Sequence, residues 1–531
     1  MTDSQPSAKS QIARAAGTVM AAFIFSNLVG LVRGIVLGRA FGTSGDMDAF
    51  NAANRVTEML FNLMAGGALG SAFIPTFSGL LSKRETREAW KLASAVANLL
   101  LMVLSLAALL AAIFAPQVVR YGLFVLAPGQ EAGQEALTVD LLRIMLPSIA
   151  IFGLSGLVMG ILNAHQRFLV PALAPAMYSL GMIGGTLLLP QSLGIHRLAW
   201  GALAGSGLHL LVQIPSLFRL PERRYWFILG RGVPAVREVL LLMGPRLFGV
   251  AVVQLNFIVN TVLALSQAEG SATAVALAFS LMLMPQAAVA QSIAIAALPT
   301  FSRQVSLGRQ DEMRSSLAAA LRGILLLALP AAVGLILLRE PIIAFLYEKD
   351  AFTAHSTQMV AWALLWYAVG LPSHSVYEIL SRAFYALHDT RTPVTVGVVA
   401  MGLNIVMSFG FSALFGSLGL MPHGGLALAN STATTLEMLI LLVIMRRRLN
   451  GLDGVQIWRG LGAAGLGSAV MGGALLLWLT VMANQPRAWI VLGGLAVGVG
   501  LYGVTMLTLR VNEPRALLRW IWARLARRVS R

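Results

Sequence analysis

Apolar stretches of about 20 residues, each long enough to cross the roughly 30 Å hydrocarbon core of a bilayer as a helix, recur along this chain of 531 residues. The composition points the same way, because 11% of the residues are charged, whereas a soluble protein carries about 25%. The sequence therefore predicts an all-α integral membrane protein with about 14 transmembrane helices. Their approximate ranges are 12–39, 48–80, 92–115, 140–163, 170–190, 198–218, 238–266, 273–302, 316–338, 358–386, 394–417, 424–445, 460–482 and 488–509.

A four-residue sequence, Pro-Thr-Phe-Ser, occurs at 75–78 and again at 299–302. Three further pairs recur in the same order and at nearly the same interval along the chain, namely Pro116 with Pro341, His165 with His388, and Pro171 with Pro393. Two equivalent halves that each cross a membrane are typical of transporters, in which the substrate lies between the repeats.

The repeat also predicts the domain organisation. Two six-helix lobes, at 11–220 and 236–448, are expected to be related by a pseudo-two-fold axis normal to the membrane, because an even number of crossings makes both halves run the same way. An unrepeated helix pair follows at 456–510, and a basic tail occupies 511–531.

The net charge of +17 is distributed unevenly. With a cytoplasmic N-terminus and one crossing per stretch, 29 of the 39 Lys and Arg residues fall on the cytoplasmic side, in agreement with the positive-inside rule. We therefore expect a multi-pass protein of the cytoplasmic membrane with both termini in the cytoplasm, and residues 1–10 do not resemble a cleavable signal. The tail, with Trp520 and Trp522 among its arginines, is expected to lie on anionic lipid rather than on nucleic acid.

The residues that the sequence lacks exclude several kinds of chemistry. It has no cysteine, so no disulfide or zinc–thiolate site can form, and its seven histidines include no His-Glu-x-x-His pair. None of its four lysines follows a glycine, which excludes a phosphate-binding loop of the Gly-Lys-Ser/Thr type. We therefore expect a transporter, not an enzyme, without an ATP-binding motif, a metal site or a resident cofactor.

Polar residues follow one face of the second predicted helix. Asp48, Asn51, Arg55, Glu58 and Asn62 are spaced 3, 4, 3 and 4 residues apart, which places all five on one stripe. Charges within a membrane are costly and usually face a cavity or a partner. The stripe is therefore predicted to line water and bind substrate. In the alternative, Arg55 and Glu58 neutralise each other and Asp48 lies at the outer rim.

The first predicted helix carries a single arginine near its middle. Arg33 shares a face with Ser26 and Gly30, and Asn27 lies beside that face. A guanidinium group presents a fork of donors that suits phosphate oxygens, so Arg33 is a candidate ligand of an anionic substrate. In the alternative, Arg33 forms a structural pair with a carboxylate of the second helix.

The seventh predicted helix matches the first in its place within the repeat. Arg246, Asn256 and Asn260 share a face, and Arg246 follows directly after Gly244-Pro245. Arg246 either occupies a broken turn with a free backbone carbonyl or extends to the cytoplasmic interface. Arg246 and Asn256 join the candidate substrate-binding residues.

Two groups of polar residues in the second half are candidates for coupling to an ion. His374 and Glu378, followed by Arg382, are spaced one helical turn apart, so they either carry a proton or form a charge-compensated structural stripe. Asn404, Asn430 and Thr434, with Ser408, either supply oxygens to a small cation or join helices through hydrogen bonds. Na⁺, H⁺ or the membrane potential is the expected source of energy.

Taken together, several stretches resemble the MurJ (MviN) family of lipid II flippases in the MOP exporter superfamily. They run from helix 1 to helix 12 and comprise Phe-Gly at 41–42, Asp-Ala-Phe at 48–50, Ala-Gly-Gly-Ala at 65–68, Ala-Phe-Ile-Pro at 72–75, Ile-Leu-Asn at 161–163 with Arg167-Phe168 and Pro171, Met-Gly-Pro at 243–245, Phe352-Thr353, and the run from Ala383-Phe384-Tyr385 to Pro393. The combination is specific although each piece is not.

This resemblance implies fourteen helices in two lobes around a cationic cavity, with the final helix pair forming a groove for a lipid tail. The implied substrate is the undecaprenyl-pyrophosphate-linked peptidoglycan precursor. Arg33 falls on a functionally important arginine of the family, and Asp48 on the acidic residue that opens helix 2. The chain departs from the family at three other arginine positions, which fall on Asn27, on Phe61 or Asn62, and on Ser280.

The function that the resemblance implies is movement of lipid II from the cytoplasmic to the outer leaflet by alternating access, with membrane lipids and cell-wall synthesis proteins as partners. Within the same superfamily, the alternatives are a flippase for another polyprenyl-linked oligosaccharide and a cation-coupled exporter. A membrane-embedded glycosyltransferase would need catalytic carboxylates, and Glu131, Glu135 and Asp140 have no recognisable catalytic spacing. A transport-inactive scaffold is a further alternative, suggested by the missing arginines.

Overall fold

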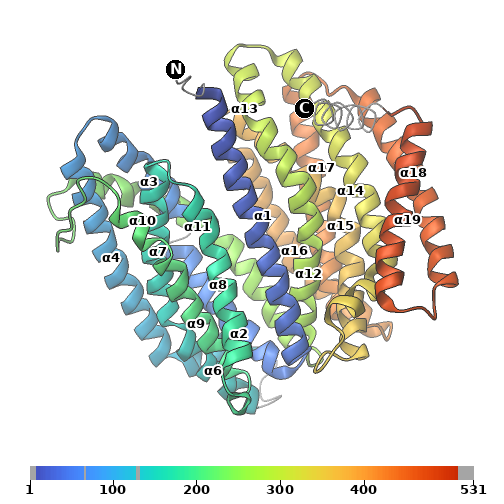
Figure 1. The fold of residues 1–531 in the computed structure, drawn as a ribbon, viewed down its shortest axis with the longest axis horizontal. Helices are drawn as coiled ribbons and strands as arrows, with labels where there is room; N and C mark the ends of the chain where they lie inside the picture. Colours follow the sequence, from blue (N-terminus) through green and yellow to red (C-terminus); the bar gives the residue numbers. More distant parts are fainter. Residues whose placement is uncertain (1–7, 65–66, 127–131, 512–531) are drawn as a thin grey trace, which may run out of the picture. The chain divides into compact units, whose positions relative to one another are not determined.

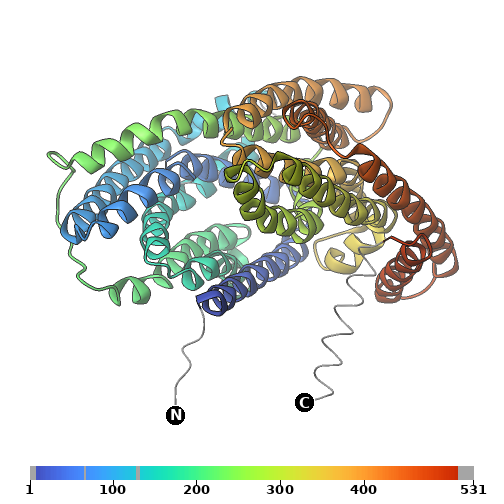
Figure 2. The same cartoon turned by 90° about the horizontal axis from the view of Figure 1, so that it is seen from above.

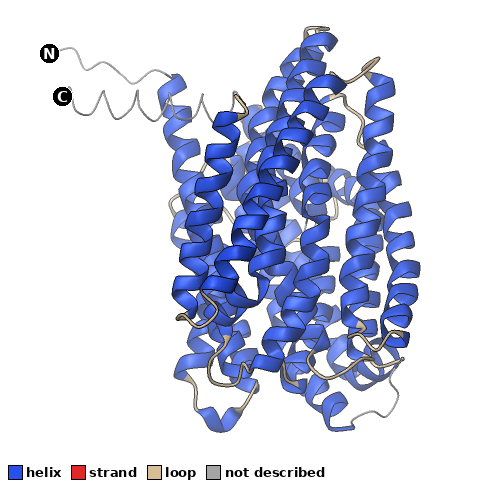
Figure 3. Cartoon of the chain, turned by 90° about the vertical axis from the view of Figure 1, so that its right-hand side faces the viewer, coloured by secondary structure: helices blue, strands red, loops and turns tan. Residues whose placement is uncertain are grey.

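The computed structural model describes residues 8–64, 67–126 and 132–511 of the chain. Within these ranges every regular element is a helix, as Figure 3 shows. The all-α prediction is therefore confirmed for the described residues. The predicted basic tail at 511–531 lies outside them from residue 512 onwards.

Each of the predicted stretches coincides with one helix or with a pair of consecutive helices. The unbroken ones are α1 (Ala8–Phe41), α4 (Thr86–Ile113), α8 (Leu169–Leu188), α11 (Pro234–Leu265), α14 (Gln310–Tyr347), α15 (Ala354–Ala386), α16 (Arg391–Ser417), α17 (His423–Arg448), α18 (Gly454–Val481) and α19 (Arg487–Thr508). Among the described residues, 11 helical spans are long and apolar enough to cross a membrane. The chain is therefore a multi-pass membrane protein, and the number of 14 crossings stays a prediction.

Four predicted stretches are divided, and a proline lies at three of the breaks, namely Pro147, Pro215 and Pro285. The pairs are α2 (Gly45–Met64) with α3 (Gly67–Ser82), α6 (Ala132–Met145) with α7 (Pro147–Ala164), α9 (His196–Leu211) with α10 (Ile214–Phe218), and α12 (Ser271–Gln286) with α13 (Ser292–Ser306). Pro147 occupies the first position of α7, where its missing N–H costs nothing. After Pro285 the helix widens into the π-helical turn η3 (Ala287–Gln291) before α13 begins. The remaining short elements are α5 (Ala115–Val118), the π-helix η1 (Val119–Leu123) and the 3₁₀ turn η2 (Gln191–Leu193).

The two copies of Pro-Thr-Phe-Ser lie in helices with the same local structure. After α3, the backbone N–H of Glu85 donates to Leu80 at 2.9 Å, and after α13 that of Arg309 donates to Gln304 at 2.9 Å. The two donors, and likewise the two acceptors, are separated by the same interval as Pro75 and Pro299. The first residues of α4 and α14 are also separated by this interval. The repeat is therefore present in the folded chain as well as in its sequence.

The pairing of His165 with His388 is wrong by one residue. After α7, the N–H of Arg167 donates to Leu162, and after α15 that of Asp389 donates to Phe384. This pair of turns makes His388, with a φ of 58°, correspond to Gln166, with a φ of 60°. Pro171 and Pro393 are separated by the same interval as the two turns, so their pairing is correct, and a chance match of two histidines misled the alignment.

The chain divides into two compact units. The first comprises Met1–Thr273 with Lys349–Phe352, and the second comprises Ala274–Glu348 with Thr353–Arg531. The first unit includes α11, which packs against α2 and α3, whereas the repeat assigns this helix to the second lobe. The predicted lobes, 11–220 and 236–448, place α11 in the second lobe, whereas its packing places it in the first unit. The other bounds of the two lobes stay a prediction.

Glycines bring α8 and α9 together in the first unit (Figure 1). A Cβ atom added to Gly181 would lie 2.2 Å from the Cα of Gly205, and one added to Gly185 would lie 2.4 Å from the Cα of Gly201. Small residues allow helix backbones to approach closely in a membrane, where apolar burial alone gives little preference for one partner. This contact fixes α8, the helix against which α1 packs.

In the second unit, α18 and α19, the orange-red helices of Figures 1 and 2, pack against each other and against α14, which is yellow in Figure 1. Leu338 of α14 packs in one cluster with Met471 and Leu475 of α18. Tyr502 of α19 donates a hydrogen bond of 2.5 Å to the carbonyl of Leu326. The unrepeated helix pair is thus part of the second unit, attached along one long helix.

Candidate functional site

Arg33 lies half-buried on α1 and faces α8. Its Nη1 atom lies 3.8 Å from the sulfur of Met182, and two turns earlier Ser26 donates a hydrogen bond of 2.8 Å to the carbonyl of Ala172. In the described part of the chain, no carboxylate lies within ion-pair distance of Arg33. The alternative in which Arg33 pairs with a carboxylate of the second helix is therefore wrong.

Two features lie close to Arg33, an open helix face at Gly30 and the phenol group of Tyr178. A Cβ atom added to Gly30, one turn away, would meet no atom within 4 Å, so this glycine does not serve a close helix contact. Tyr178 of α8 is half-buried and lies within electrostatic range of both Arg33 and Glu58. Asn27 is exposed on α1. Arg33 is thus a guanidinium group held against α8 with room beside it.

Asp48 is only 2% exposed, and its carboxylate is fully used in capping another helix. One oxygen accepts the backbone N–H of Thr273 at 2.7 Å and its hydroxyl at 2.6 Å, and the other accepts the N–H of Gly270 at 2.7 Å. These residues open α12 and belong to the first unit. A carboxylate at a helix N-terminus satisfies free N–H groups and interacts favourably with the helix dipole.

The junction around Asp48 is reciprocal. Glu269, just before α12, accepts the backbone N–H of Gly45, the first residue of α2, at 2.6 Å. Asn51 adds a hydrogen bond of 3.0 Å to the hydroxyl of Thr273. Asp48, which is buried, does not line water as the prediction for the stripe requires, whereas Asn51 is half-buried and its contact with water or substrate stays a prediction.

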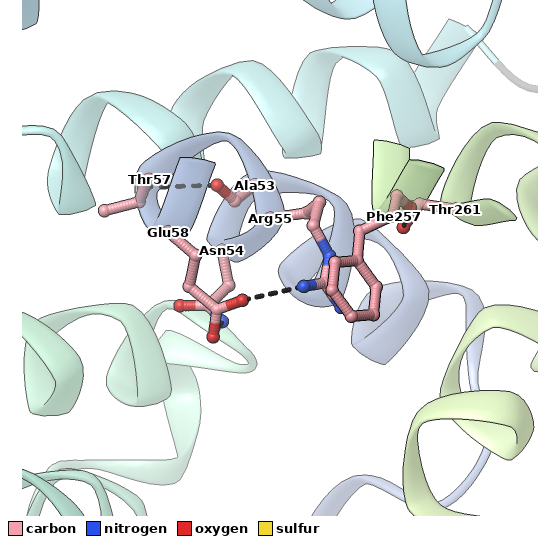
Figure 4. A network of polar contacts seen from close by, with 7 residues as sticks. All are labelled: Ala53, Asn54, Arg55, Thr57, Glu58, Phe257 and Thr261. Atoms are coloured by element: carbon pink, nitrogen blue, oxygen red, sulfur yellow. Dashed lines mark hydrogen bonds and ion pairs between the residues drawn. The ribbon is translucent and has the colours of Figure 1, made fainter. Parts of the chain in front are cut away.

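Arg55 and Glu58 form an ion pair on α2, as the alternative interpretation of the stripe proposed (Figure 4). The Nη1 atom of Arg55 lies 2.9 Å from an oxygen of Glu58, and Asn54 donates to the other oxygen at 3.0 Å. The Arg55 guanidinium also lies 5.0 Å from the ring centre of Phe257 on α11, a cation–π contact. Asn62, further along the stripe, is half-buried.

The candidate site residues of α11 whose side chains the structure describes are two asparagines. Asn256 is 7% exposed, and Asn260 donates to its backbone carbonyl at 3.0 Å and to its side-chain oxygen at 3.3 Å. The side chain of Arg246 lies outside the described residues, so its predicted contact with substrate stays a prediction.

The predicted proton pair of the second unit does not form. His374 of α15 bonds through Nε2 to the side-chain oxygen of Asn430 on α17 at 3.1 Å. Glu378 pairs instead with Arg382, one turn further along α15, at 3.3 Å. The charge-compensated stripe is therefore the correct interpretation of Glu378 and Arg382.

The other candidate coupling residues are buried at helix contacts. Asn404 and Ser408 of α16 and Thr434 of α17 are all less than a tenth exposed. Among the described residues, no group of three His, Asp or Glu side chains could hold a metal ion. A role for these residues in cation binding is untested, and the hydrogen bond between His374 and Asn430 favours helix-to-helix bonding at that point.

Glu437, which lies in the apolar stretch at 424–445 on α17, was not among the residues predicted to have a function. It is half-buried, and no ion pair or hydrogen bond from its carboxyl group is found in the described residues. The available signal was a single acidic residue inside a predicted transmembrane helix, which is a functional-site candidate on physical grounds.

The family model and the related sequences agree on one family. The family model described as "Lipid II flippase MurJ" matches residues 37–494. Lipid II flippase MurJ of Burkholderia cenocepacia is 31% identical over 442 residues, which cover 82% of this chain and 84% of that protein. A probable lipid II flippase MurJ of Vibrio cholerae is 29% identical over 517 residues, which cover 93% of this chain and 95% of that one.

Solved structures agree with these relatives. A structure described as lipid II flippase MurJ in an inward closed conformation has a TM-score of 0.78 at 26% identity and covers 94% of this chain and 99% of its own. An inward-facing multidrug transporter of the MATE family in the MOP superfamily has a TM-score of 0.65 at 15% identity, which shows a shared fold alone. By its sequence over most of its length and by its fold, this chain belongs to the MurJ family of lipid II flippases.

Proposed function

We propose that this chain moves lipid II, the polyprenyl-pyrophosphate-linked peptidoglycan precursor, from the cytoplasmic to the outer leaflet of the cell membrane. The observation that carries the proposal is the family match over residues 37–494, joined with a fold that aligns over 94% of the chain. Relatives covering 82% and 93% of the chain are named as lipid II flippases or probable ones. Peptidoglycan synthesis is the process that this activity serves.

Within this function, Arg33 is the residue best suited to hold the pyrophosphate. It has no carboxylate partner in the described part of the chain, and it lies half-buried beside the open face of Gly30. A guanidinium group binds two phosphate oxygens at once through charge-assisted hydrogen bonds. Arg55 is already paired with Glu58, so it can bind an anion only when that pair opens.

The finer architecture belongs to this proposal too. We place fourteen crossings in two lobes that alternate between an inward-open and an outward-open state, with both termini cytoplasmic and α18 and α19 providing the surface for the lipid tail. Leu476, Leu477 and Val499 are exposed apolar side chains on that pair, which supports contact with acyl chains. Asp48 and its bonds to Gly270 and Thr273 then stabilise one of the two states.

The proposed energy source of the cycle is the membrane potential, with H⁺ or Na⁺ as the alternative. A substrate carrying negative charge responds to the membrane potential, since one charge moved through 100 mV changes its free energy by about 2.3 kcal/mol. The bias of basic residues toward one side and the family match support insertion in the cytoplasmic membrane, where cell-wall synthesis proteins would be the partners that this function implies.

Complementation tests the function and Arg33 together. Cells depleted of their own lipid II flippase should survive when they express this chain, and should lyse when they express the Arg33→Ala variant at an equal level. Arg120→Ala is the matched control, because Arg120 is an exposed arginine outside the proposed site. Survival with Arg33→Ala would remove Arg33 from the site, and lysis with the unaltered chain would refute the function.

A further inference from the structure

One carboxyl group inside the membrane-spanning part of the second unit, that of Glu437, has no ion pair or hydrogen bond among the residues that the structure describes. Glu437 is the fifteenth residue of α17, about 21 Å from the first residue of the helix and about 16 Å from the last, at 1.5 Å per residue. Both distances place it within the hydrocarbon region and away from the headgroups. A charge in that region is retained only when something compensates it.

Among the described residues, the neighbours of Glu437 include a glycine, two apolar side chains and one titratable phenol group. A Cβ atom added to Gly397 of α16 would lie 3.1 Å from Oε1 of Glu437, so the carboxyl group rests on the bare face of that glycine. Tyr377 of α15 is the titratable side chain within electrostatic range of it. Met438 and Leu441, its neighbours on α17, pack in the hydrophobic core of the unit.

No cation among the described residues neutralises Glu437. Two helices, α15 and α16, pack against α17 most extensively. On α15, Arg382 is paired with Glu378, and His374 is bonded to Asn430. On α16 the one ionisable side chain is Arg391, at the first residue of the helix and six residues before Gly397. Glu437 itself has no ion pair in the described part of the chain.

We propose that Glu437 is a proton-binding site, whose carboxyl group takes up and releases one proton as the second unit changes its environment during transport. Proton uptake converts a carboxylate oxygen into a hydroxyl and removes the charge, and release returns the proton to water. A proton is a better fit than a metal cation, because a proton needs one carboxyl oxygen, whereas hard cations take six or more oxygen ligands, and no group of three acidic or histidine side chains among the described residues could hold a metal ion.

The role in transport rests on the proposed flippase function, whereas proton binding does not, so two experiments separate them. The first is infrared difference spectroscopy of the purified full-length protein in lipid nanodiscs during a change of pH. The carbonyl-stretch band of a protonated carboxyl group should decrease in Glu437→Gln by the contribution of one residue. Glu437→Asp keeps a carboxyl group and should retain the band, which distinguishes loss of the site from misfolding.

Glu378 provides the matched control for the infrared measurement. It is a glutamate of the neighbouring helix that already has an arginine partner, so Glu378→Gln should leave the Glu437 band unchanged. An unchanged band in Glu437→Gln would overturn the proposal. A band that responds to sodium concentration at constant pH would also overturn it, because the ligand would then be a metal cation.

The second experiment measures flipping of fluorescent lipid II in proteoliposomes with and without an imposed gradient of one pH unit. For a cycle that moves one proton, a gradient of one pH unit adds about 1.4 kcal/mol to the driving force, which changes the equilibrium ratio of lipid II between the leaflets about tenfold. The unaltered protein and Glu340→Gln, which alters an exposed glutamate of α14, should respond to the gradient, and Glu437→Gln should not. An equal response of Glu437→Gln would exclude Glu437 from coupling. Absence of flipping by every variant would refute the flippase function while the infrared result still decides the proton site.

Discussion

At the scale of single residues, two arginines of the first unit show what separates a ligand from a structural group. Arg55 has its charge matched by Glu58 at 2.9 Å and its planar face covered by Phe257. Among the described residues, Arg33 has no carboxylate within ion-pair distance and no ring covering its planar face, and it contacts the thioether sulfur of Met182, with the phenol of Tyr178 within electrostatic range. An anion that reaches both groups gains more from Arg33, because no existing pair has to be broken.

The cap that Asp48 provides should be measurable as stability. Asp48→Asn removes the charge from three buried hydrogen bonds and should lower the free energy of unfolding by about 1–3 kcal/mol. Asp46→Asn is the matched control, since Asp46 is exposed in the same first turn of α2 and should change stability by less than about 0.5 kcal/mol. Thermal unfolding in detergent compares the two variants, and equal losses would show that Asp48 is not a cap.

Asp389, in the loop between α15 and α16, supports a pH-dependent prediction. Burial raises the pKa of this carboxyl group, but hydrogen bonds from the hydroxyl and N–H of Thr392 and the Arg448 guanidinium at 2.6 Å more than offset that effect, so the pKa lies below its usual value. A lowered pKa in the folded state gives stability that is present above the unfolded pKa of about 3.9 and is lost as the pH falls through the folded pKa.

Asp389→Asn should therefore lower the apparent unfolding temperature equally at pH 7 and pH 5, and the difference from the unaltered protein should vanish only below about pH 4. Thermal unfolding at a series of pH values measures this. A difference that disappears between pH 7 and pH 5 would contradict the assigned contacts.

The sequence predicted the face of α2 correctly but not the partners of its side chains. Spacing within one helix shows which residues share a stripe. It gives no information about Thr273 and Gly270, which lie far along the chain and use both oxygens of Asp48. The ion pair of Arg55 with Glu58 was predictable as an alternative, because those two residues lie one turn apart on the same helix.

At the scale of helices, small residues and prolines account for the contacts and the breaks. The closest helix contact described in the first unit is that of α8 with α9, and glycine is required there because the backbones nearly touch. Hydropathy located both helices, but it could not show that one face of each carries a row of glycines in contact. The breaks at Leu146 and within 287–291 were missed because a hydropathy average does not register where one helix stops and the next begins.

The contact of α8 with α9 gives a prediction at this scale. Gly181→Ala should destabilise the protein by about 1–3 kcal/mol, because the added methyl group would overlap the backbone of Gly205. Gly207→Ala, on α9 and with no atom within 4 Å of the added Cβ, should be neutral or stabilising by up to about 1 kcal/mol. Thermal unfolding compares the two variants with the unaltered protein. Equal unfolding temperatures for Gly181→Ala and Gly207→Ala would show that α8 and α9 are not packed this closely.

At the scale of the whole chain, the repeat was the most informative feature of the sequence. It predicted equivalent helices, and the turns that follow α3 and α13 have the same backbone hydrogen bonds at equivalent positions. It did not predict that α11 packs with α2 and α3, because equivalent positions in a repeat do not determine which neighbours a helix takes. Glu437 was missed for a different reason. A single charge changes the average hydropathy of a stretch of about 20 residues only slightly, so the stretch is still predicted as an ordinary transmembrane helix.

The most direct test of the central claim is flipping of fluorescent lipid II by the purified protein in proteoliposomes, followed by quenching of the dye from outside. The unaltered chain and Arg120→Ala should move the lipid between leaflets, and Arg33→Ala should fall to the rate of protein-free vesicles while its unfolding temperature stays within a few degrees. Flipping by Arg33→Ala at the rate of the unaltered chain would contradict a site built on Arg33.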